Sequence, residues 1–565
     1  MNPSVWTLGT ACALTALLSA CGGSDTPPQL RQAQPGSLVS CGTLASGFSH
    51  ANTAITSASV VAAGTLSNGG APVGEHCVVS GKMNQRTSSV DGQTYAIGFE
   101  MRLPKDWNGR FLYQGNGGTD GVISQAVGNI SAGGMLRHAL QQGFAVISSD
   151  AGHSAAQNPL FGLDPQARLD YGYQAVGTLT PMAKALIKAA YGKGPDRAYI
   201  GGTSNGGRHT MVAAARYAAD YDGYLAGSPG FNLPKAAVAQ LYGAQQWATV
   251  ATDRANLETG FNATERALVA SAILAKCDAL DGLADGLVND VQACRSAFDL
   301  QRDVPTCAGA RDGSCLSAAQ KTAYGNVMAG ARNSKGEALY SRWPYDPGVR
   351  APGWADWKFR NSVGSSRDPV AVGFIFSSPP ASSSILSDTL SYALGFNMDV
   401  DAPRIFATSG MYTESAMSFM TPPNPTKLNT LRDRGAKMIV FHGNSDPVFS
   451  VDDTSAWFDA LDAEYGGTAS RFVRLFRVPG MGHSRGGPAT DQFDALAALV
   501  AWVENGQAPD SLVATARGAG NPGGVNADVP ADWSPSRTRL LCPYPLQAYY
   551  IGGDKETAAS FACRK

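Results

Sequence analysis

A serine lies among glycines directly after an apolar run in residues 199–208, YIGGTSNGGR. Residues 202–206 fit the G-x-S-x-G pattern, with a strand expected before the serine and a helix after it. Glycines permit the strained turn that raises a serine hydroxyl above the edge of a sheet. We therefore predict that Ser204 is a nucleophile and that this segment is more than an ordinary glycine-rich turn.

A serine nucleophile needs a histidine to accept its proton and a carboxylate to orient that histidine. His483 lies in a glycine-rich loop after the last strong strand pattern, and Asp446 follows another strand pattern. The order Ser204, Asp446, His483 is that of α/β-hydrolases. His442 is the competing base, but it precedes Asp446 and would break this order. The other histidines lie in the N-terminal segment, in helical patterns or before the nucleophile: His50, His76, His138, His153 and His209.

An ester-cleaving serine also needs two backbone N–H groups that stabilise the oxyanion. The residue after the nucleophile, Asn205, supplies one of them. A glycine-rich turn after an expected strand, residues 115–118, supplies the second, and we assign it to Gly118. Gly117 fits the spacing nearly as well, and a simple hairpin loop is the alternative for the whole segment.

Residues 277–290, CDALDGLADGLVND, place three aspartates around two glycines. The carboxylates of Asp278, Asp281 and Asp285 and the carbonyls of Leu283 and Leu287 are hard oxygen ligands that suit Ca²⁺. The segment does not match the EF-hand pattern, because no glutamate follows at its closing position. A cluster of helix-capping aspartates is the alternative. We predict a structural calcium site rather than a catalytic metal.

The elements around these residues alternate between strand and helix patterns, which predicts an α/β fold with a mostly parallel sheet. The expected strands and helices are paired strands within 95–115, a helix at 135–142, a strand at 144–149, a helix at 171–191, a strand at 197–200, a helix from about 208, strands at 437–442 and 471–478, and a helix at 491–505. The alternation is lost over residues 231–425. We predict a catalytic domain of residues 41–230 and 426–565, with 231–425 inserted as a lid domain.

The N-terminus carries an apolar run that is too short to span a bilayer and that ends in small residues. We predict a signal peptide over residues 1–20. Residues 18–21, LSAC, are similar to a bacterial lipobox, so Cys21 is a candidate lipid anchor at the outer membrane. A plain signal peptide with an incidental Cys21 is the alternative, since the first ten residues hold no Lys or Arg. Residues 21–40 are expected to be a flexible tether of an exported protein, either periplasmic and outer-membrane-anchored or secreted.

Ten cysteines fit an oxidising compartment, and eight remain when Cys12 and Cys21 are removed with the signal peptide. A zinc site is the competing reading, but the chain has no CxxC pair. Spacing suggests four local disulfides, although sequence alone leaves the connectivity open. The suggested pairs are Cys41–Cys77, Cys277–Cys294, Cys307–Cys315 and Cys542–Cys563.

The charges of the chain nearly balance, with 44 Lys and Arg against 45 Asp and Glu. No basic tract is present that could bind nucleic acid by releasing its counterions. We therefore expect a small-molecule substrate, no nucleic-acid partner and a monomeric protein.

These motifs together resemble the tannase/feruloyl esterase family, and within it the type that hydrolyses mono(2-hydroxyethyl) terephthalate. The motifs that carry the likeness are GxSxGG, CDALDGLADG, the FHGNSD strand and loop, VPGMGH, and a terminal LCPYP followed by Cys563. The resemblance implies an α/β-hydrolase core, a large lid with structural Ca²⁺, and hydrolysis of esters of aromatic acids. By position it assigns the same triad, oxyanion donors and calcium ligands that are named above.

The resemblance also implies the walls of a substrate pocket. Trp357 and Phe449 match aromatic walls of the family, although Trp357 could equally belong to the lid core. Arg367 is a loose match to the lid arginine that engages a free carboxylate in terephthalate-type members. The substrate is therefore expected to be a terephthalate monoester or a feruloyl ester. The alternative is a tannin or another phenolic ester, which the enzyme would bind without recognising a substrate carboxylate. A non-catalytic surface-binding lipoprotein is a remote alternative, against which the complete Ser, His and Asp set argues.

One departure from the family generates a prediction. Members typically carry a disulfide between the residue before the nucleophile and the residue after the histidine, and this chain has Thr203 and Ser484 there. Thr203→Cys combined with Ser484→Cys should raise the melting temperature, because the new bond would tie two loops of the triad together. Thermal unfolding of the oxidised double variant measures this, and an unchanged or lower melting temperature would count against it.

Overall fold

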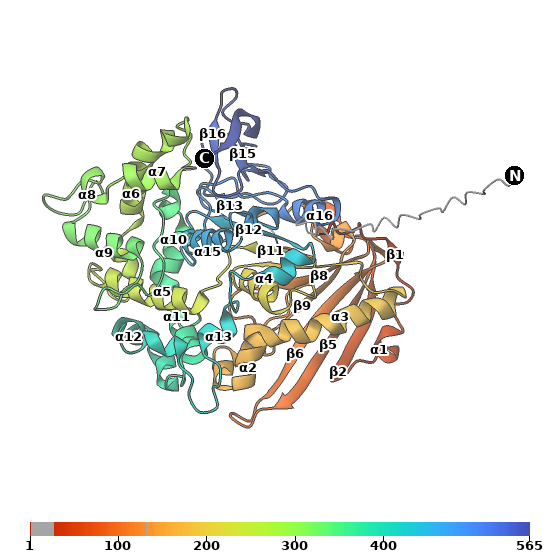
Figure 1. Cartoon of the computed structure of the whole chain (residues 1–565). Helices are drawn as coiled ribbons and strands as arrows, with labels where there is room; N and C mark the ends of the chain where they lie inside the picture. Colours follow the sequence, from red (N-terminus) through yellow and green to blue (C-terminus); the bar gives the residue numbers. More distant parts are fainter. Residues whose placement is uncertain (2–27, 131–132) are drawn as a thin grey trace.

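A nine-stranded sheet forms the centre of the protein, in the order β13-β12-β11-β10-β8-β9-β6-β5-β2 (Figure 1). The computed structural model describes Met1 and residues 28–130 and 133–565. The strands from β13 to β9 run parallel, and β6, β5 and β2 continue the sheet antiparallel. This sheet has the predicted α/β-hydrolase architecture. The strands are β2 (Thr53–Val61), β5 (His76–Thr87), β6 (Thr94–Pro104), β8 (Arg110–Gly115), β9 (Ala145–Ser149), β10 (Arg197–Thr203), β11 (Gly223–Gly227), β12 (Lys437–Gly443) and β13 (Val473–Val478).

Two expectations near the oxyanion segment were wrong. The strand patterns within 95–115 form β6 and β8, but β9 lies between them, because β8 pairs in parallel with both β9 and β10. The expected helix at 135–142 is only a three-residue 3₁₀ turn, Leu140–Gln142. Glycines explain this difference, since Gly134 and Gly143 both adopt positive φ, at 70° and 89°.

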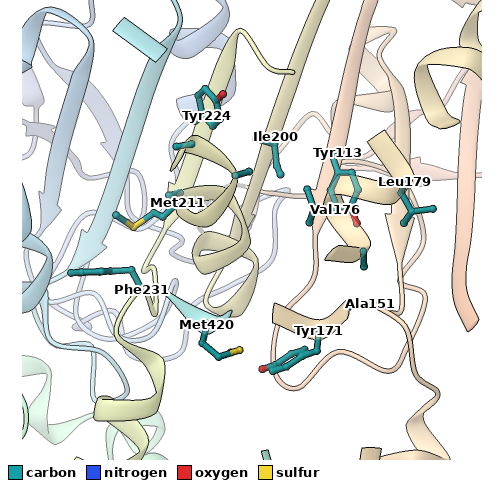
Figure 2. Close-up of a cluster of buried hydrophobic side chains, with 14 of the residues drawn as sticks. Tyr113, Ala151, Tyr171, Val176, Leu179, Ile200, Met211, Tyr224, Phe231 and Met420 are labelled. Atoms are coloured by element: carbon teal, nitrogen blue, oxygen red, sulfur yellow. The ribbon is translucent and has the colours of Figure 1, made fainter. Parts of the chain in front are cut away.

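Helices cover both faces of the sheet, and the strands alternate their side chains between them. In β12, Met438 and Val440 join the apolar cluster beneath α3 (Ala175–Tyr191) and α4 (Asn205–Arg216). Ile439 joins the opposite cluster with α16 (Ala495–Asn505). Figure 2 shows part of the first cluster, where side chains of the sheet meet those of the helices above it. Burial on both faces explains why the parallel strands read as nearly continuous apolar runs.

The chain between β11 and β12 forms helices and no named strand, which is the segment expected to be an inserted lid. Its longest helices are α5 (Leu233–Ala248), α6 (Ala263–Cys277) and α9 (Ala318–Ala329), and they lie beside the sheet in Figure 1. They bury their own aromatic cluster, in which Trp247 contacts Phe261 and Phe359 with ring centroids 5.5 and 5.3 Å apart. Other parts of the same segment pack against the sheet, since Phe374 and Phe419 belong to the cluster that contains Met438 and Val440.

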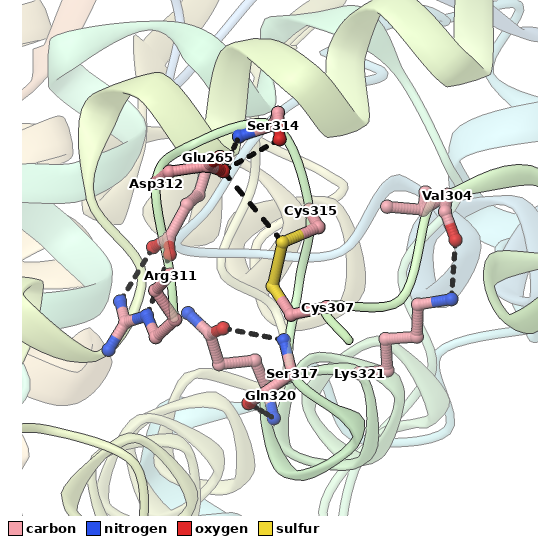
Figure 3. Close-up of a disulfide and its surroundings, with 10 residues drawn as sticks. All are labelled: Glu265, Val304, Cys307, Arg311, Asp312, Ser314, Cys315, Ser317, Gln320 and Lys321. Atoms are coloured by element: carbon pink, nitrogen blue, oxygen red, sulfur yellow. Dashed lines mark hydrogen bonds and ion pairs between the residues drawn. A yellow bond between two sulfur atoms is a disulfide. The ribbon is translucent and has the colours of Figure 1, made fainter. Parts of the chain in front are cut away.

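Disulfides join the four cysteine pairs that the spacing suggested, Cys41–Cys77, Cys277–Cys294, Cys307–Cys315 and Cys542–Cys563. Figure 3 shows the Cys307–Cys315 bond in the lid. Beside it, the buried Glu265 accepts hydrogen bonds from Nε and Nη2 of Arg311, both at 2.8 Å. The loop that the disulfide closes is therefore also tied to α6.

Residues 28–40 differ from the flexible tether that the sequence predicted. The Gln29 side chain donates to the Val503 carbonyl at 2.8 Å, and the Ala33 amide donates to Glu504 Oε2 at 2.9 Å. Strand β1 (Gly36–Ser37) then pairs with β7 (Asp106–Trp107). Backbone hydrogen bonds, which composition does not reveal, hold this segment against the catalytic domain.

The predicted signal peptide beyond Met1, with Cys21, lies outside the described residues. Among those that are described, no helix has the length and apolar character needed to cross a membrane.

Candidate active site

Ser204 occupies a strained turn between β10 and α4, with φ 63° and ψ −123°. Its amide donates to the Gly227 carbonyl of the neighbouring strand at 2.9 Å. The flanking glycines are required by space, because a Cβ on Gly202 or Gly206 would lie 2.4 or 2.3 Å from the Gly115 carbonyl oxygen. This is the nucleophile turn that the glycine pattern indicated. Such a backbone costs on the order of 1–3 kcal/mol and persists only where its surroundings enforce it.

The structure brings the three predicted triad residues together at the carboxyl ends of parallel strands. His483 Nε2 lies 2.8 Å from Ser204 Oγ, and His483 Nδ1 lies 2.8 Å from Asp446 Oδ2. The serine follows β10, the aspartate follows β12 and the histidine follows β13. These contacts are the ones that a serine needs in order to lose its proton to an oriented imidazole.

Asp446 is fully buried and held as a carboxylate. Its Oδ1 accepts hydrogen bonds from the amides of Val448 and Phe449 at 2.8 and 3.1 Å. Burial by itself would raise the pKa of Asp446, but the His483 charge and the hydrogen bonds from His442 and His483 outweigh it and hold that pKa well below its usual range. The group therefore stays ionised and can stabilise an imidazolium.

His442, the competing base, has a supporting place instead. Its side chain is completely buried, and its Nε2 faces two acceptors, Asp446 Oδ2 at 3.2 Å and the Phe449 carbonyl at 3.0 Å. Two acceptors require the proton on Nε2, which leaves Nδ1 to accept from Thr454 Oγ1 at 2.9 Å. The ring thus orients Asp446 from behind.

The amides of Asn205 and Gly118 fit the expected oxyanion donors. Neither amide donates a hydrogen bond within the described part of the chain. Both residues line the cavity that contains Ser204, and Gly118 adopts φ 67°, which favours glycine. Gly117, the alternative, borders only a second cleft, which also contains Ser204.

A buried carboxylate that the sequence did not indicate ties the two oxyanion segments together. Asp120 Oδ2 accepts from the Asn205 side-chain amide and contacts His209 Nε2, both at 2.8 Å. Arg208 Nε holds the same Asn205 side chain through its Oδ1 at 2.6 Å. The spacing of Asn205 and His209 is i, i+4 on one helix face, and it is the sequence signal that could have indicated this contact.

Apolar and aromatic side chains wall the cavity beside Ser204. The predicted walls Trp357 and Phe449 both line it, and their rings lie 5.5 and 5.3 Å from the His483 ring. Trp357 also packs against the aromatic cluster that contains Trp247. The empty space between the walls is about 520 Å³, open solvent included. Further lining comes from Tyr171, Leu233, Ala236, Ala237, Phe376 and Val448.

Three charged residues lie in or behind this cavity. Arg367 was predicted from the sequence, and Asp368 and Lys358 were not. Arg367 lines the cavity with its guanidinium 5.7 Å from the Trp357 ring centroid, and it forms no hydrogen bond or ion pair with any described residue. Burial raises the pKa of the neighbouring Asp368 to about 7, and its buried Oδ2 has no hydrogen-bond partner. Burial also lowers the pKa of Lys358 to about 7, with its Nζ 3.3 Å from Gln240 Oε1.

The acidic loop that was predicted to bind calcium is tightly folded. Asp278 accepts from the amides of Asp285 and Gly286 at 2.9 Å each, and Asp281 accepts from the Asn289 side chain. Burial raises the pKa of Asp281 to about 7. The hydrogen bond from Asn289 offsets part of this shift, and the Asp285 charge adds to it. Asp285 pairs with Arg539, with Nε at 2.9 Å.

The oxygen atoms of this loop are of the type that Ca²⁺ prefers, but the carboxylates do not converge on one point. The carbonyls of Leu283 and Leu287 accept no hydrogen bond from the described residues, so they are available as ligands. However, no group of three acidic, His or Cys side chains converges as a metal cluster anywhere in the described part of the chain. A cation would therefore have to draw Asp281 and Asp285 away from their present partners.

Comparisons with known proteins agree with this geometry. The family model described as tannase and feruloyl esterase matches residues 77–564. A mono(2-hydroxyethyl) terephthalate hydrolase of Piscinibacter sakaiensis is 41% identical over 527 residues, which cover 86% of this chain and 85% of that one. Feruloyl esterase C of Talaromyces stipitatus is 26% identical over 484 residues, 81% of this chain and 80% of that one.

Solved structures show the same fold at low sequence identity. Feruloyl esterase B from Aspergillus oryzae superposes with a TM-score of 0.72 at 22% identity, covering 93% of this chain and 99% of that one. A tannin acyl hydrolase from Aspergillus niger gives a TM-score of 0.66 at 20% identity, covering 92% and 93%. The chain belongs to the tannase and feruloyl esterase family and is a carboxylic ester hydrolase with an α/β-hydrolase fold.

Proposed function

We propose that the protein hydrolyses esters of aromatic acids through an acyl-enzyme formed on Ser204. The observation that carries the proposal is the continuous contact from Ser204 Oγ through His483 to Asp446, with 2.8 Å at each step. Two free amides, those of Gly118 and Asn205, border the same cavity. These are the parts that acyl transfer requires.

In the first half-reaction, Ser204 Oγ attacks the ester carbonyl carbon while His483 Nε2 takes the serine proton. The amides of Gly118 and Asn205 hold the resulting oxyanion, and Asp446 stabilises the imidazolium. When the intermediate collapses, the carbon–oxygen bond to the alcohol breaks and His483 gives its proton to the leaving oxygen. Water then attacks the acyl-enzyme in the same way, its proton passes through His483 to Ser204, and the free acid leaves.

The walls of the cavity support an aromatic acyl group. Trp357, Phe449 and Tyr171 offer ring faces and edges to a flat substrate. The names of the relatives given above refer to a terephthalate monoester and to feruloyl esters, so either acyl group is a candidate. Arg367 could pair with a terephthalate carboxylate, whereas Asp368 beside it favours a neutral phenolic ring such as a feruloyl or tannin acyl group.

A panel of p-nitrophenyl, ferulate, gallate and terephthalate monoesters tests the reaction. Wild-type enzyme should cleave one aromatic ester best, and Ser204→Ala should lower kcat by about 10⁴-fold or more, because no other group can form the acyl-enzyme. Initial rates with both enzymes measure this, and thermal unfolding checks that the variant is folded. Activity that survives in Ser204→Ala would overturn the mechanism.

Asp120 is proposed to position the oxyanion donors through the Asn205 side chain. Asp120→Ala should lower kcat by roughly 10- to 100-fold with a smaller change in KM, since an oxyanion donor acts mainly in the transition state. Asp120→Asn keeps an acceptor oxygen for Asn205 and should recover part of the loss. Steady-state kinetics well below the melting temperature measure both variants, and an unchanged kcat in Asp120→Ala would refute the role.

Structural calcium is proposed in the lid, held by Asp278, Asp281, Asp285 and the carbonyls of Leu283 and Leu287. The support is the donor chemistry of the loop and the burial of Asp281, which together with the Asp285 charge raises its pKa. A cation there would relieve the repulsion between Asp281 and Asp285 and stabilise the lid. It takes no part in the ester chemistry.

Excess Ca²⁺ should therefore raise the melting temperature by roughly 2–5 °C relative to EDTA, because an ion that binds only the folded state stabilises it. Asp281→Asn should abolish most of this difference. Asp356→Asn, at a half-exposed position that forms a salt bridge with Arg360, is the matched control and should keep it. Equal melting temperatures of the wild type in Ca²⁺ and EDTA would contradict a calcium site.

Export of the protein is part of the same proposal. Four disulfides are expected in an oxidising compartment, which supports removal of residues 1–20 as a signal peptide. We also propose that Cys21 is lipidated, that residues 231–425 act as a lid domain over the catalytic domain, and that the protein is a monomer.

A further inference from the structure

Two cavities meet at Ser204, and they differ in polarity. The first is the aromatic cavity described above, which His483 does not line. The second, here called the alcohol cleft, also contains Ser204 and shares Gly118, Trp357 and Arg367 with the first. It is lined by Gly118, Thr203, Arg367, His483, Ser484 and Arg485, among others.

The position of His483 decides which half of the ester each cavity receives. His483 Nε2 accepts the serine proton at 2.8 Å and must later give it to the oxygen of the leaving alcohol. That oxygen therefore lies beside His483, and the rest of the alcohol extends into the cleft that His483 lines. The apolar cavity with Phe449, which shares Trp357 with the cleft, is left for the aromatic acyl group.

The alcohol cleft carries positive charge. Its described lining includes Arg367 and Arg485 and no aspartate or glutamate. Neither guanidinium forms a hydrogen bond or an ion pair with the residues that the structure describes. Arg367 also lines the aromatic cavity, where the Asp368 carboxyl lies beside it, so Arg485 is the less compensated of the two arginines.

Two acids lie close to Arg485 or to the adjacent Gly486, and neither pairs with Arg485. Asp491 is committed to Arg517, whose Nη2 lies 2.7 Å and Nε 2.9 Å from its two carboxylate oxygens. Asp528 accepts from the Gly487 amide at 2.8 Å and forms no salt bridge with Arg485. The Arg485 guanidinium is therefore available to a ligand.

A third group in the cleft lacks a partner. Ser484 Oγ is buried and has no hydrogen-bond partner, although its backbone amide donates to Ser228 Oγ at 3.2 Å. Because this oxygen is closed off from solvent, the donors that face the cleft are the two guanidiniums, which suit a carboxylate.

We propose that the alcohol cleft binds an anionic leaving group, so that the preferred substrates are aromatic-acid esters of hydroxy acids whose free carboxylate pairs with Arg485, supported by Arg367. This inference rests on the proposed ester hydrolysis, because it uses His483 to orient the substrate. It adds a recognition element on the alcohol side of the ester, separate from the acyl group.

Two matched esters test the proposal: an aromatic acid esterified to 3-hydroxypropanoate and the same acid esterified to 3-hydroxypropanamide. Each is made with the acyl group that the ester panel shows to be cleaved fastest. The two alcohols differ in charge and little in size. At low ionic strength kcat/KM should favour the carboxylate ester by about 5- to 10-fold, and about 1 M NaCl should reduce this ratio because the rim of the cleft is exposed.

Variants at Arg485 identify the group responsible. Arg485→Gln should bring the ratio of the two kcat/KM values towards one, and Arg485→Lys should keep part of the preference. Arg471→Gln makes the same change in net charge and is the control. Arg471 lies just before the amino end of β13, whereas Arg485 follows its carboxyl end, so this variant should keep the wild-type ratio.

The outcomes separate this inference from the proposed function. A wild-type ratio of one or less, or a ratio that Arg485→Gln leaves unchanged, would overturn the anionic alcohol site while ester hydrolysis stands. If the wild-type enzyme cleaves no ester of the panel and neither matched ester, the proposed function fails and the inference fails with it.

Discussion

The hydrogen bonds from Ser204 through His483 to Asp446 impose the tightest geometric constraint on the molecule. Each contact is 2.8 Å long and joins loops from different parts of the chain. They can form only because β10, β11, β12 and β13 are parallel neighbours whose carboxyl ends share one edge. Register is equally important, since the pairs Thr203–Gly227 and Gly443–Val478 end the strands level with one another.

Hydrogen bonds link the loops of Thr203 and Ser484, the two positions at which the family resemblance implied a disulfide in other members. The Ser484 amide donates to Ser228 Oγ at 3.2 Å, and the Ser228 amide donates to the Phe441 carbonyl at 2.7 Å. The histidine loop is thereby linked to β11 and β12 without a covalent bond. Behind the aspartate, His442 and Thr454 complete a buried support in which each polar atom has a partner.

Charge is distributed unevenly around the serine, and this asymmetry bears on specificity. The acyl side is mostly apolar, with Asp368 and Lys358 each shifted towards neutrality by burial. The alcohol side is polar and holds two arginines with no acid in its lining. An enzyme with such a site can distinguish esters by the alcohol as well as by the acid, because the two halves of the substrate meet opposite environments.

The sequence by itself determined the parts of the site that depend on local chemistry. The glycines around Ser204 indicated the turn because only glycine fits beside the Gly115 carbonyl, and the chain order of Ser204, Asp446 and His483 pointed to one fold. The cysteine spacing likewise suggested the four pairs, because each partner lies nearby along the chain. The pattern of strands and helices predicted the mostly parallel sheet, but the insertion of β9 between β6 and β8 is a long-range pairing that no local signal carries.

Only the tertiary structure decided which other residues serve the site. Asp120 and His209 come from distant segments and acquire their role by burial against Asn205, while His442 became a support because both acceptors beside it face Nε2. The charges of the alcohol cleft were equally hidden, since Arg367 and Arg485 belong to the lid and to the histidine loop and meet only when the chain folds. Sequence patterns report backbone conformation and spacing, whereas the burial and pairing of charges depend on segments that are far apart in the chain.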